Sequence, residues 1–216
     1  LGQNNRTQYS SPVQIPGTTW GASTAVLGNK THLSVGIYNT FAIKTDGTLW
    51  AWGYNYYGSL GQNEAHGSYY SSPVQIPGTT WKNVTAGYYE TFATKTDGTL
   101  WGWGDNNDGA LGLNDRTQRS SPTQIAGSTW DIVDNLTDKG GIALKTDGTL
   151  WSWGYNDQGA LGQNQSYPSF AKRSSPTQIP GTNWSNISGY AYGAMAVKTD
   201  GTLWTWGYNN NGQLGH

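Results

Sequence analysis

The 216-residue chain contains no cysteine, which excludes disulfide bonds and thiolate metal sites. Charged residues make up only 12% of the chain and the formal net charge is −1, so bulk electrostatic attraction to nucleic acid is not expected. The sequence has no apolar run of 18 residues and no recognisable signal peptide, so membrane insertion is not expected either. Because the sequence starts with leucine, we expect a processed product or a piece of a longer protein.

Motifs for catalysis or metal binding are also missing. The three histidines, His32, His66 and His216, have no partner at metal-ligand spacing, and there is no nucleotide-binding glycine loop or nucleophile elbow. Residues 105–109 (DNNDG) lack the sixth-position glycine and the closing glutamate of a calcium loop, which favours a structural turn. We therefore expect a protein without enzymatic activity, metal or cofactor.

Internal repetition is the main feature that the sequence does have. The heptapeptide KTDGTLW occupies residues 44–50, 95–101, 145–151 and 198–204. A second block of the form SSP-[VT]-QI begins in step at residues 10, 71, 120 and 174. A period near 50 residues with strand-like content is typical of a propeller or array in which each repeat is one supersecondary unit. Residues 1–216 are therefore expected to form a single domain of four repeats.

Each repeat is predicted to contain four strands. KTDGTLW places Asp-Gly between two alternating segments, which is the strongest short hairpin signal. In the second repeat the predicted strands cover residues 82–87, 91–95, 99–103 and 120–125. Four antiparallel strands per repeat make one propeller blade. The predicted fold is thus all-β, a propeller of four four-stranded antiparallel blades.

The third strand of every repeat carries a Trp-x-Trp pair. The pairs are Trp50/Trp52, Trp101/Trp103, Trp151/Trp153 and Trp204/Trp206. Residues i and i+2 project from one face of a strand, so each pair can fill the gap between stacked blades with two wide rings. The alternative is that the indoles stack on sugars or bases. We favour the structural role, because the pairs recur identically while the loops vary.

The two ends of the chain lie at the same phase of the repeat. Residues 10–15 have the pattern of a fourth strand without a preceding third, and the last repeat has no fourth strand. We predict that residues 10–15 pair beside residues 202–206, which would close the ring and remove both exposed edges. Two alternatives are that two chains form a larger ring and that the segment belongs to a longer array.

These motifs resemble the regulator-of-chromosome-condensation family of propeller repeats. The resemblance covers nearly the whole chain and rests on the TFA-[IT]-KTDGTLW-x-WG stretches, the G-x-L-G turns and the SPVQI segment. They lie at residues 40–53 and 91–104, at residues 58–61, 109–112, 159–162 and 212–215, and at residues 11–15 and 72–76. The resemblance implies a propeller, but it fixes no activity, because the family includes GTPase exchange factors, a plant ultraviolet receptor and bacterial inhibitory or surface proteins.

The chain departs from the family pattern in several places. Family rings usually have seven blades, and four repeats are present here. The family's histidine at the start of the second strand is replaced, for example by Asn39, Glu90 and Gly193. No counterpart of the exchange-factor wedge loop or of the photoreceptor's Trp-Arg-His clusters is present. The near-identical, asparagine-rich repeats look most like bacterial or phage versions.

Strand parity predicts one face of the disc that varies from blade to blade. Turns between first and second strands emerge on the same face as loops between third and fourth strands, and we call it the variable face. Its candidate binding residues are Tyr38, His66, Tyr69, Tyr70, Tyr88, Tyr89, Glu90, Arg116, Arg119, Tyr167, Phe170, Lys172, Arg173 and Tyr192. Tyrosine and arginine among small polar residues are typical of recognition surfaces. The alternative is a set of solvated loops with incidental tyrosines.

We interpret the chain as a non-enzymatic propeller that binds a partner, a protein or a surface glycan, through the variable face. An extracellular or virion-surface adhesion module of bacterial or phage origin is expected. One alternative is a lectin that binds one sugar per blade and gains affinity from multivalency. Another is a structural assembly subunit that self-associates, for instance through the inserted residues 21–30 of the first repeat.

Overall fold

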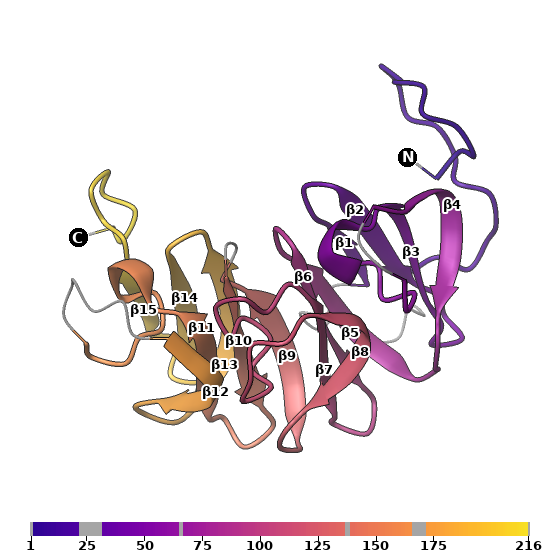
Figure 1. Ribbon diagram of the computed structural model, residues 1–216. Helices are drawn as coiled ribbons and strands as arrows, with labels where there is room; N and C mark the ends of the chain where they lie inside the picture. The colour runs from indigo at the N-terminus through magenta and orange to yellow at the C-terminus, as the bar shows by residue number, and fades with distance from the viewer. Residues whose placement is uncertain (1, 22–31, 65–66, 137–138, 166–171, 216) are drawn as a thin grey trace.

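The computed structural model describes residues 2–21, 32–64, 67–136, 139–165 and 172–215. They form four antiparallel sheets that follow one another along the chain (Figure 1). The first sheet contains β1 (Leu33–Val35), β2 (Asn39–Ile43), β3 (Leu49–Tyr54) and β4 (Tyr69–Ile76). The second contains β5 (Trp81–Ala86), β6 (Glu90–Lys95), β7 (Leu100–Gly104) and β8 (Arg119–Ile125). The predicted strands of the second repeat are confirmed to within one residue at each end.

The third and fourth sheets complete the described chain. The third contains β9 (Trp130–Asn135), β10 (Gly140–Lys145), β11 (Leu150–Tyr155) and β12 (Lys172–Ile179). The fourth has three strands, β13 (Trp184–Tyr190), β14 (Gly193–Lys198) and β15 (Leu203–Gly207). Two single 3-10 turns, η1 (Tyr56–Gly58) and η2 (Asp157–Gly159), follow β3 and β11. Neither is long and apolar enough to span a membrane, and no other helix occurs in the described ranges.

The heptapeptide KTDGTLW forms the same hairpin in every sheet. In the second sheet, Asp97 accepts hydrogen bonds from the backbone amide and the hydroxyl of Thr99, at 2.9 and 2.7 Å. The indole of Trp101 donates to the same hydroxyl at 2.8 Å, and Gly98 adopts the left-handed conformation that the turn requires. Lys95 lies over Trp101 and over Trp81, with its ammonium 4.4 and 4.6 Å from the ring centroids. These mutual contacts explain why the heptapeptide recurs without change.

In the second, third and fourth sheets the second tryptophan of the pair lies against the preceding repeat. Trp103 and Trp153 are fully buried. The indole of Trp103 donates to the carbonyl of Ser59 in the preceding repeat at 2.8 Å, and Trp206 donates to that of Ala160 at 3.0 Å. The structural role of these tryptophans is therefore confirmed.

Polar contacts join the first strands of adjacent repeats. The amide of Ala86 in β5 donates to the hydroxyl of Ser34 in β1 at 2.9 Å. The side chain of Asn83 donates to the carbonyl of Asp131 in β9 at 2.7 Å, and Asp134 accepts from the amide of Gly189 in β13 at 2.9 Å. The relative placement of the sheets is thus set by buried tryptophans and by a chain of specific hydrogen bonds.

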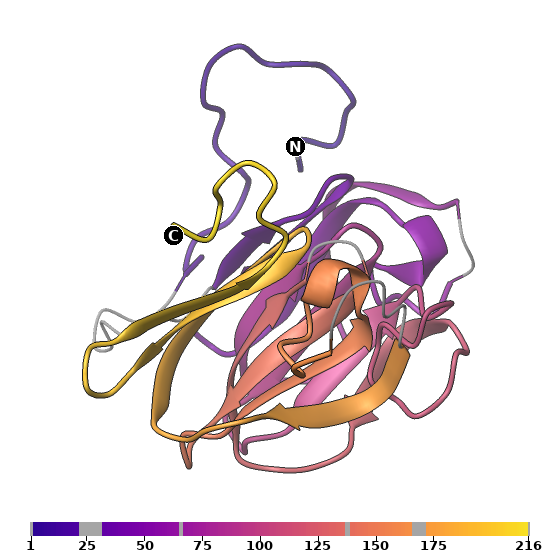
Figure 2. The same ribbon diagram turned by 90° about the vertical axis from the view of Figure 1, so that its left-hand side faces the viewer.

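The predicted closure of the ring is wrong for this structure. Residues 10–15 form no strand, and β15 pairs only with β14 among the described residues. The sheets make an open arc with the two ends of the chain at its opposite ends (Figure 1), and Figure 2 shows residues 2–15 as an arm that projects beyond the sheets, while Asn4 holds it to the first sheet by a hydrogen bond to Ser71. The inter-sheet contacts bend four sheets through only part of a circle, so residues 10–15 do not reach β15. The insertion expected at residues 21–30 lies almost entirely outside the described residues.

Candidate binding surface

One backbone hydrogen bond recurs on the variable face of all four sheets. The residue after each third-strand Trp-Gly donates its amide to a residue of the turn between the first and second strands. The donor and acceptor pairs are Tyr54 and Tyr38 (2.8 Å), Asp105 and Tyr89 (3.1 Å), Tyr155 and Lys139 (2.9 Å), and Tyr208 and Tyr192 (3.0 Å). The scaffold therefore holds two variable side chains next to each other in every repeat. The prediction that these turns share a face is confirmed.

Seven tyrosines of the first two sheets form one connected group on this face. This tyrosine cluster consists of Tyr38, Tyr54, Tyr56, Tyr57, Tyr69, Tyr88 and Tyr89. The Tyr54 and Tyr69 rings stack with centroids 4.4 Å apart, and Tyr88 meets Tyr89 edge-on at 4.3 Å. Tyr56 of the first sheet stacks on Tyr89 of the second at 4.7 Å. The cluster is therefore a continuous aromatic surface across two sheets.

Three phenols of the cluster, those of Tyr38, Tyr54 and Tyr89, have a pKa above the usual value. The phenol of Tyr88, through its charge and its hydrogen bond, raises the pKa of Tyr38. Burial, followed by the phenol of Tyr69, raises the pKa of Tyr54, and burial also raises that of Tyr89. Just beside the cluster, burial and the carboxylate of Glu64 raise the pKa of Tyr70 to about 12. At these positions the surface thus offers phenol hydroxyls as hydrogen-bond donors and acceptors.

A cleft of about 500 Å³ lies where the arm meets the first sheet. Its walls include Asn5, Arg6 and Tyr9 of the arm, and Tyr54 and Tyr69 of the cluster. The guanidinium of Arg6 lies 4.2 Å from the ring centroid of Tyr69, a cation–π distance. The cleft extends the aromatic surface with a positive charge and an amide, so it can accept a polar or anionic group of a ligand.

Tyr57 has a strained backbone. Its φ of 52° lies in the left-handed region, which is unfavourable for a bulky side chain. Its ring nevertheless contacts Tyr56 at 4.7 Å and Tyr89 at 5.1 Å. Gln158 at the same position of the third repeat has a φ of 56°, so this conformation belongs to the repeated turn, and the ring contacts of Tyr57 are what distinguishes the first repeat.

The next interface on the same face uses different chemistry at the same positions. Asp108 corresponds to Tyr57, and Lys139 corresponds to Tyr89. Here the two residues form an ion pair at 2.9 Å, and Asp108 also binds the ammonium of Lys172. Burial alone would raise the pKa of Asp108, but the two lysines hold it below its usual value. The DNNDG segment is thus a turn with a paired carboxylate, and no group of three or more metal-ligating side chains occurs in the described ranges.

Four of the candidate binding residues, Tyr38, Tyr69, Tyr88 and Tyr89, belong to the cluster, and Tyr70 lines the cleft. The remaining described candidates lie elsewhere on the face. Arg116 is exposed, Arg119 pairs with Asp115 at 2.5 Å, Lys172 pairs with Asp108, half-buried Arg173 lies in β12, and Tyr192 meets Tyr208 at 6.0 Å. His66, Tyr167 and Phe170 lie outside the described residues.

Glu90 is a correction to the predicted surface. Its side chain is only 2% exposed, and one of its carboxylate oxygens accepts a hydrogen bond from the amide of Tyr89 at 3.2 Å. The Glu90 side chain supports the turn from its buried side and offers almost no surface to a partner. Tyr54, Tyr56, Tyr57 and Arg6 also belong to the surface, although the sequence did not lead us to predict them. A visible signal for the three tyrosines was that residues 54–57 (YNYY) differ from 105–108 (DNND) directly after the constant Trp-Gly.

Four successive antiparallel sheets, one per repeat and stacked through buried tryptophans, define an arc of a β-propeller. The sequence profile of the regulator of chromosome condensation (RCC1) repeat matches residues 46–94, 97–134 and 147–197. A second profile of the same repeat matches residues 31–59, 81–110 and 184–213. The chain therefore belongs to the RCC1 repeat family.

Relatives in sequence include the ultraviolet-B receptor UVR8 of Arabidopsis thaliana, 30% identical over 195 residues, which are 85% of this chain and 42% of that protein. Protein pim1 of Schizosaccharomyces pombe is 28% identical over 196 residues, 88% of this chain and 29% of that protein. The chain thus spans less than half the length of these relatives.

Two solved structures share the fold. Human WBSCR16 has a TM-score of 0.75 at 22% identity, over 99% of this chain and 56% of that one. Prp20p of Saccharomyces cerevisiae, described as binding Gsp1p and histones, has a TM-score of 0.70 at 20% identity, over 91% of this chain and 49% of that one. The arc described here therefore matches about half of a longer propeller.

Proposed function

We propose that this chain is a non-enzymatic interaction module that binds a protein partner through the tyrosine cluster. The observation that carries the proposal is the contrast between two equivalent interfaces. Tyr57 and Tyr89 form an aromatic contact where Asp108 and Lys139 form an ion pair. Because an ion pair occupies the same positions at the next interface, the repeat fold does not require the aromatic pair.

The chemistry of the cluster suits a protein partner. Tyrosine gives a large, rigid, amphipathic contact area at a small cost in side-chain entropy, and it is enriched at binding hot spots. The raised pKa values of Tyr38 and Tyr54 keep these two hydroxyls protonated, which suits hydrogen bonding and makes them poor general bases at neutral pH. The family resemblance adds support, since Prp20p is described as binding other proteins.

A position at a bacterial cell or virion surface is part of the proposal and rests on the weakly charged, asparagine-rich and tyrosine-rich loops.

A carbohydrate ligand is the second candidate, and the cleft beside the cluster favours it. Amide, guanidinium and phenol groups of Asn5, Arg6 and Tyr9 face the Tyr69 wall there, which is a polar and aromatic lining. A lectin with one site per repeat would need the same residues in every sheet. The counterparts of Tyr56 are instead Asn107, Asp157 and Asn210. A sugar site built on these residues therefore occurs once in the chain and is not repeated in every sheet.

The experiment replaces the aromatic contact between the first and second sheets with the ion pair found between the second and third sheets. The double variant Tyr57→Asp, Tyr89→Lys introduces the side chains of the next interface. We expect it to keep the tryptophan circular dichroism and unfolding midpoint of the wild type. Capture of partners by the immobilised protein from extracts and from a glycan array should fall at least about tenfold, the usual effect of removing a hot spot.

The matched control is Tyr192→Ala, which removes a 38% exposed tyrosine from the same face in the fourth sheet. We expect this variant to capture partners as the wild type does. Partner capture that is equal for the wild type and the double variant would refute the proposal. Loss of glycan binding without loss of any protein partner would favour the carbohydrate candidate.

A further inference from the structure

The outer edge of β15 exposes residues that are buried in the other sheets. Leu203 is 62% exposed, whereas Leu49, Leu100 and Leu150 at the same position are 0% exposed. Trp204 is 49% exposed. In the first three sheets a fourth strand covers this edge, and in the fourth sheet no described strand does. A bare edge presents unpaired amides and carbonyls to any strand of matching sequence.

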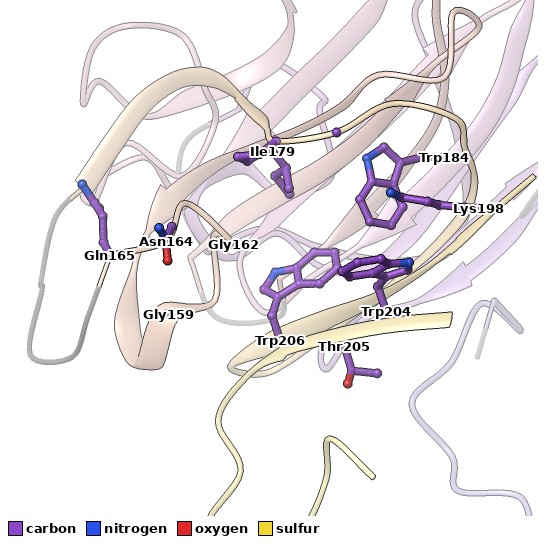
Figure 3. Close-up of a pocket in the computed structure, with 12 residues that line it drawn as sticks. Gly159, Gly162, Asn164, Gln165, Ile179, Trp184, Lys198, Trp204, Thr205 and Trp206 are labelled. Carbon is purple, nitrogen blue, oxygen red and sulfur yellow. The ribbon is translucent and has the colours of Figure 1, made fainter. Parts of the chain in front are cut away.

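A cleft of about 680 Å³ runs along this edge (Figure 3). One side is formed by Trp204 and Trp206 of β15 and by Trp184. Lys198 lies over the rings of Trp184 and Trp204, with centroid distances of 4.7 and 4.6 Å. The opposite side is formed by Ile179 at the end of β12 and by the loop that follows η2. The cleft thus has an apolar floor beside an open strand edge.

Comparison with the equivalent cleft of the first sheet shows which wall the cleft of the fourth sheet lacks. It has a volume of about 400 Å³ and contains Trp20, Lys44 and Trp50, the counterparts of Trp184, Lys198 and Trp204. Ser72 and Pro73 of β4 supply an additional wall. The cleft of the fourth sheet lacks any Ser-Pro counterpart among its lining residues and is the larger of the two. Its natural occupant is therefore a strand of the same Ser-Ser-Pro type.

The arm carries that strand. Residues 10–15 read SSPVQI, identical to residues 71–76 in β4, and they pair with no strand of the described ranges. A hydrogen bond within the arm already matches one at the equivalent positions of the first sheet. Gln3 donates to the carbonyl of Gln14 at 2.5 Å, as Gln62 donates to that of Gln75 at 3.3 Å. The arm is therefore preorganised for pairing.

The geometry of the arc argues against pairing of the arm with its own chain. Asn4 anchors the arm to the first sheet by donating to the carbonyl of Ser71 at 2.8 Å, at the end of the arc far from β15 (Figure 1). The arc also superposes on about half of a longer propeller, so its curvature is that of a ring with more than four sheets. Closing four sheets alone would break contacts such as the hydrogen bond from Trp103 to Ser59 at the inter-sheet interfaces.

We propose that the edge of β15 binds residues 10–15 of a second copy of this chain as its missing fourth strand. In the first sheet Leu49, Ala51 and Gly53 pair with Ile76, Val74 and Tyr70. The same register sets Leu203 against Ile15, Thr205 against Val13, and Gly207 against Tyr9 of the second copy. Two copies that exchange arms cover both open edges and complete both clefts, which gives a closed assembly with two-fold symmetry.

Cysteine cross-linking tests the register directly, because the chain has no cysteine of its own. Directly opposed residues of antiparallel strands have Cα atoms about 4.5–5.5 Å apart, which suits a disulfide. The variant Thr205→Cys, Val13→Cys should form covalent dimers under mild oxidation, seen on a non-reducing gel. The register control Thr205→Cys, Gln14→Cys should form far fewer, because the side chain of residue 14 points to the opposite face of the strand.

Each outcome decides the proposal. Dimers that require both cysteines of the first variant, together with a wild-type solution mass near twice 23.4 kDa, support it. A faster-migrating monomer would show that a chain pairs with its own arm and would overturn the proposal. Equal cross-linking of the two registers, or a wild type that stays monomeric throughout a concentration series, would overturn it as well. Tryptophan circular dichroism of each variant confirms that it is folded before it is scored.

Discussion

Tyr56 of the first sheet and Tyr89 of the second stack with ring centroids 4.7 Å apart and an interplanar angle of 24°. The first follows β3 and the second lies in the turn before β6, so the contact joins two repeats. The neighbouring Tyr57 also contacts Tyr89, at 5.1 Å, and the counterparts of that pair, Asp108 and Lys139, join the second and third sheets with opposite charges. One backbone frame therefore holds an aromatic surface in one place and an ionic one in the next, and the chemistry of the face can change without a change of fold.

Replacing Tyr57 by asparagine is predicted to preserve stability and weaken partner binding. Asparagine tolerates the left-handed φ of 52° better than tyrosine does, and relief of about 1 kcal/mol offsets the lost ring contacts. Tyr56→Asn is the matched control, because Tyr56 loses a ring contact without relief of such strain. Urea unfolding should show a smaller loss for Tyr57→Asn than for Tyr56→Asn. Equal losses would mean that the strain at Tyr57 is not released.

The hairpins and the general face of the site could be predicted from sequence. Asp-Gly fixes each turn by its conformational preference, and strand parity places Tyr38 and Tyr88 on one face. Tyr54 and Tyr56 were missed because they lie in a segment whose other copies are plain turns of asparagine and aspartate. Glu90 was misplaced because the inward orientation of its side chain depends on the register of β6 with β7, which the turn sequence does not show.

Ring closure could not be predicted, because curvature is a property of the interface between repeats. One repeat specifies its own strands through local patterns. The angle between two repeats depends on how Trp103 fits beneath Ser59 and how Asn83 reaches Asp131. These contacts join residues about 50 positions apart, and the recurring tryptophans do not by themselves specify the angle at which two repeats pack. The phase of the two ends indicates only that a fourth strand is missing, and it does not identify which copy of the chain supplies it.

The lysine of each heptapeptide is predicted to stabilise its sheet through two indoles. Lys145 lies 4.6 Å from the ring centroid of Trp130 and 4.7 Å from that of Trp151. Lys145→Met keeps an apolar stem but removes the charge, and we expect a loss of about 0.5–2 kcal/mol in the free energy of unfolding. Lys198→Met should lose less, because Trp204 is 49% exposed and water screens the contact. Guanidinium unfolding of both variants measures the difference, and a larger loss at Lys198 would contradict it.

Stability is predicted to fall below about pH 4 through the aspartates of the four heptapeptides. Hydrogen bonds from the side chain and backbone of Thr99 lower the pKa of Asp97 below 3.8, and the same holds at Asp46, Asp147 and Asp200. A pKa that is lower in the folded state gives stabilisation that is complete above the unfolded value and is lost as the pH falls through the folded value. The advantage of the wild type over Asp97→Asn should therefore shrink as urea unfolding is repeated from pH 7 down to pH 2.5.

Asp134 provides a control of opposite sign. Burial raises its pKa, despite hydrogen bonds from Gly189, Asn135 and Thr85. The ionised carboxylate therefore costs stability above its folded pKa, and this cost disappears as acid protonates it. Relative to Asp134→Asn, the wild type should gain stability as the pH falls through the acid range. If the stability difference between wild type and variant changed in the same direction with pH for Asp97→Asn and Asp134→Asn, the opposite pKa shifts assigned to Asp97 and Asp134 would be wrong.

Gly104→Ala is predicted to damage the fold and the tyrosine cluster together. Gly104 has a φ of 106°, and a Cβ there would lie 2.1 Å from the carbonyl oxygen of Tyr89, the atom that accepts the amide of Asp105. Gly201 has a φ of 84° with no atom within 4 Å of its Cβ position, so Gly201→Ala carries the strain of the left-handed region alone, about 1–2 kcal/mol. Gly104→Ala should lose at least about 2 kcal/mol more, because backbone must move to relieve the clash.

That movement displaces Tyr89, so partner binding should fall in Gly104→Ala and persist in Gly201→Ala. Equal unfolding midpoints for the two variants would show that the recurring backbone bond does not hold the turn in place.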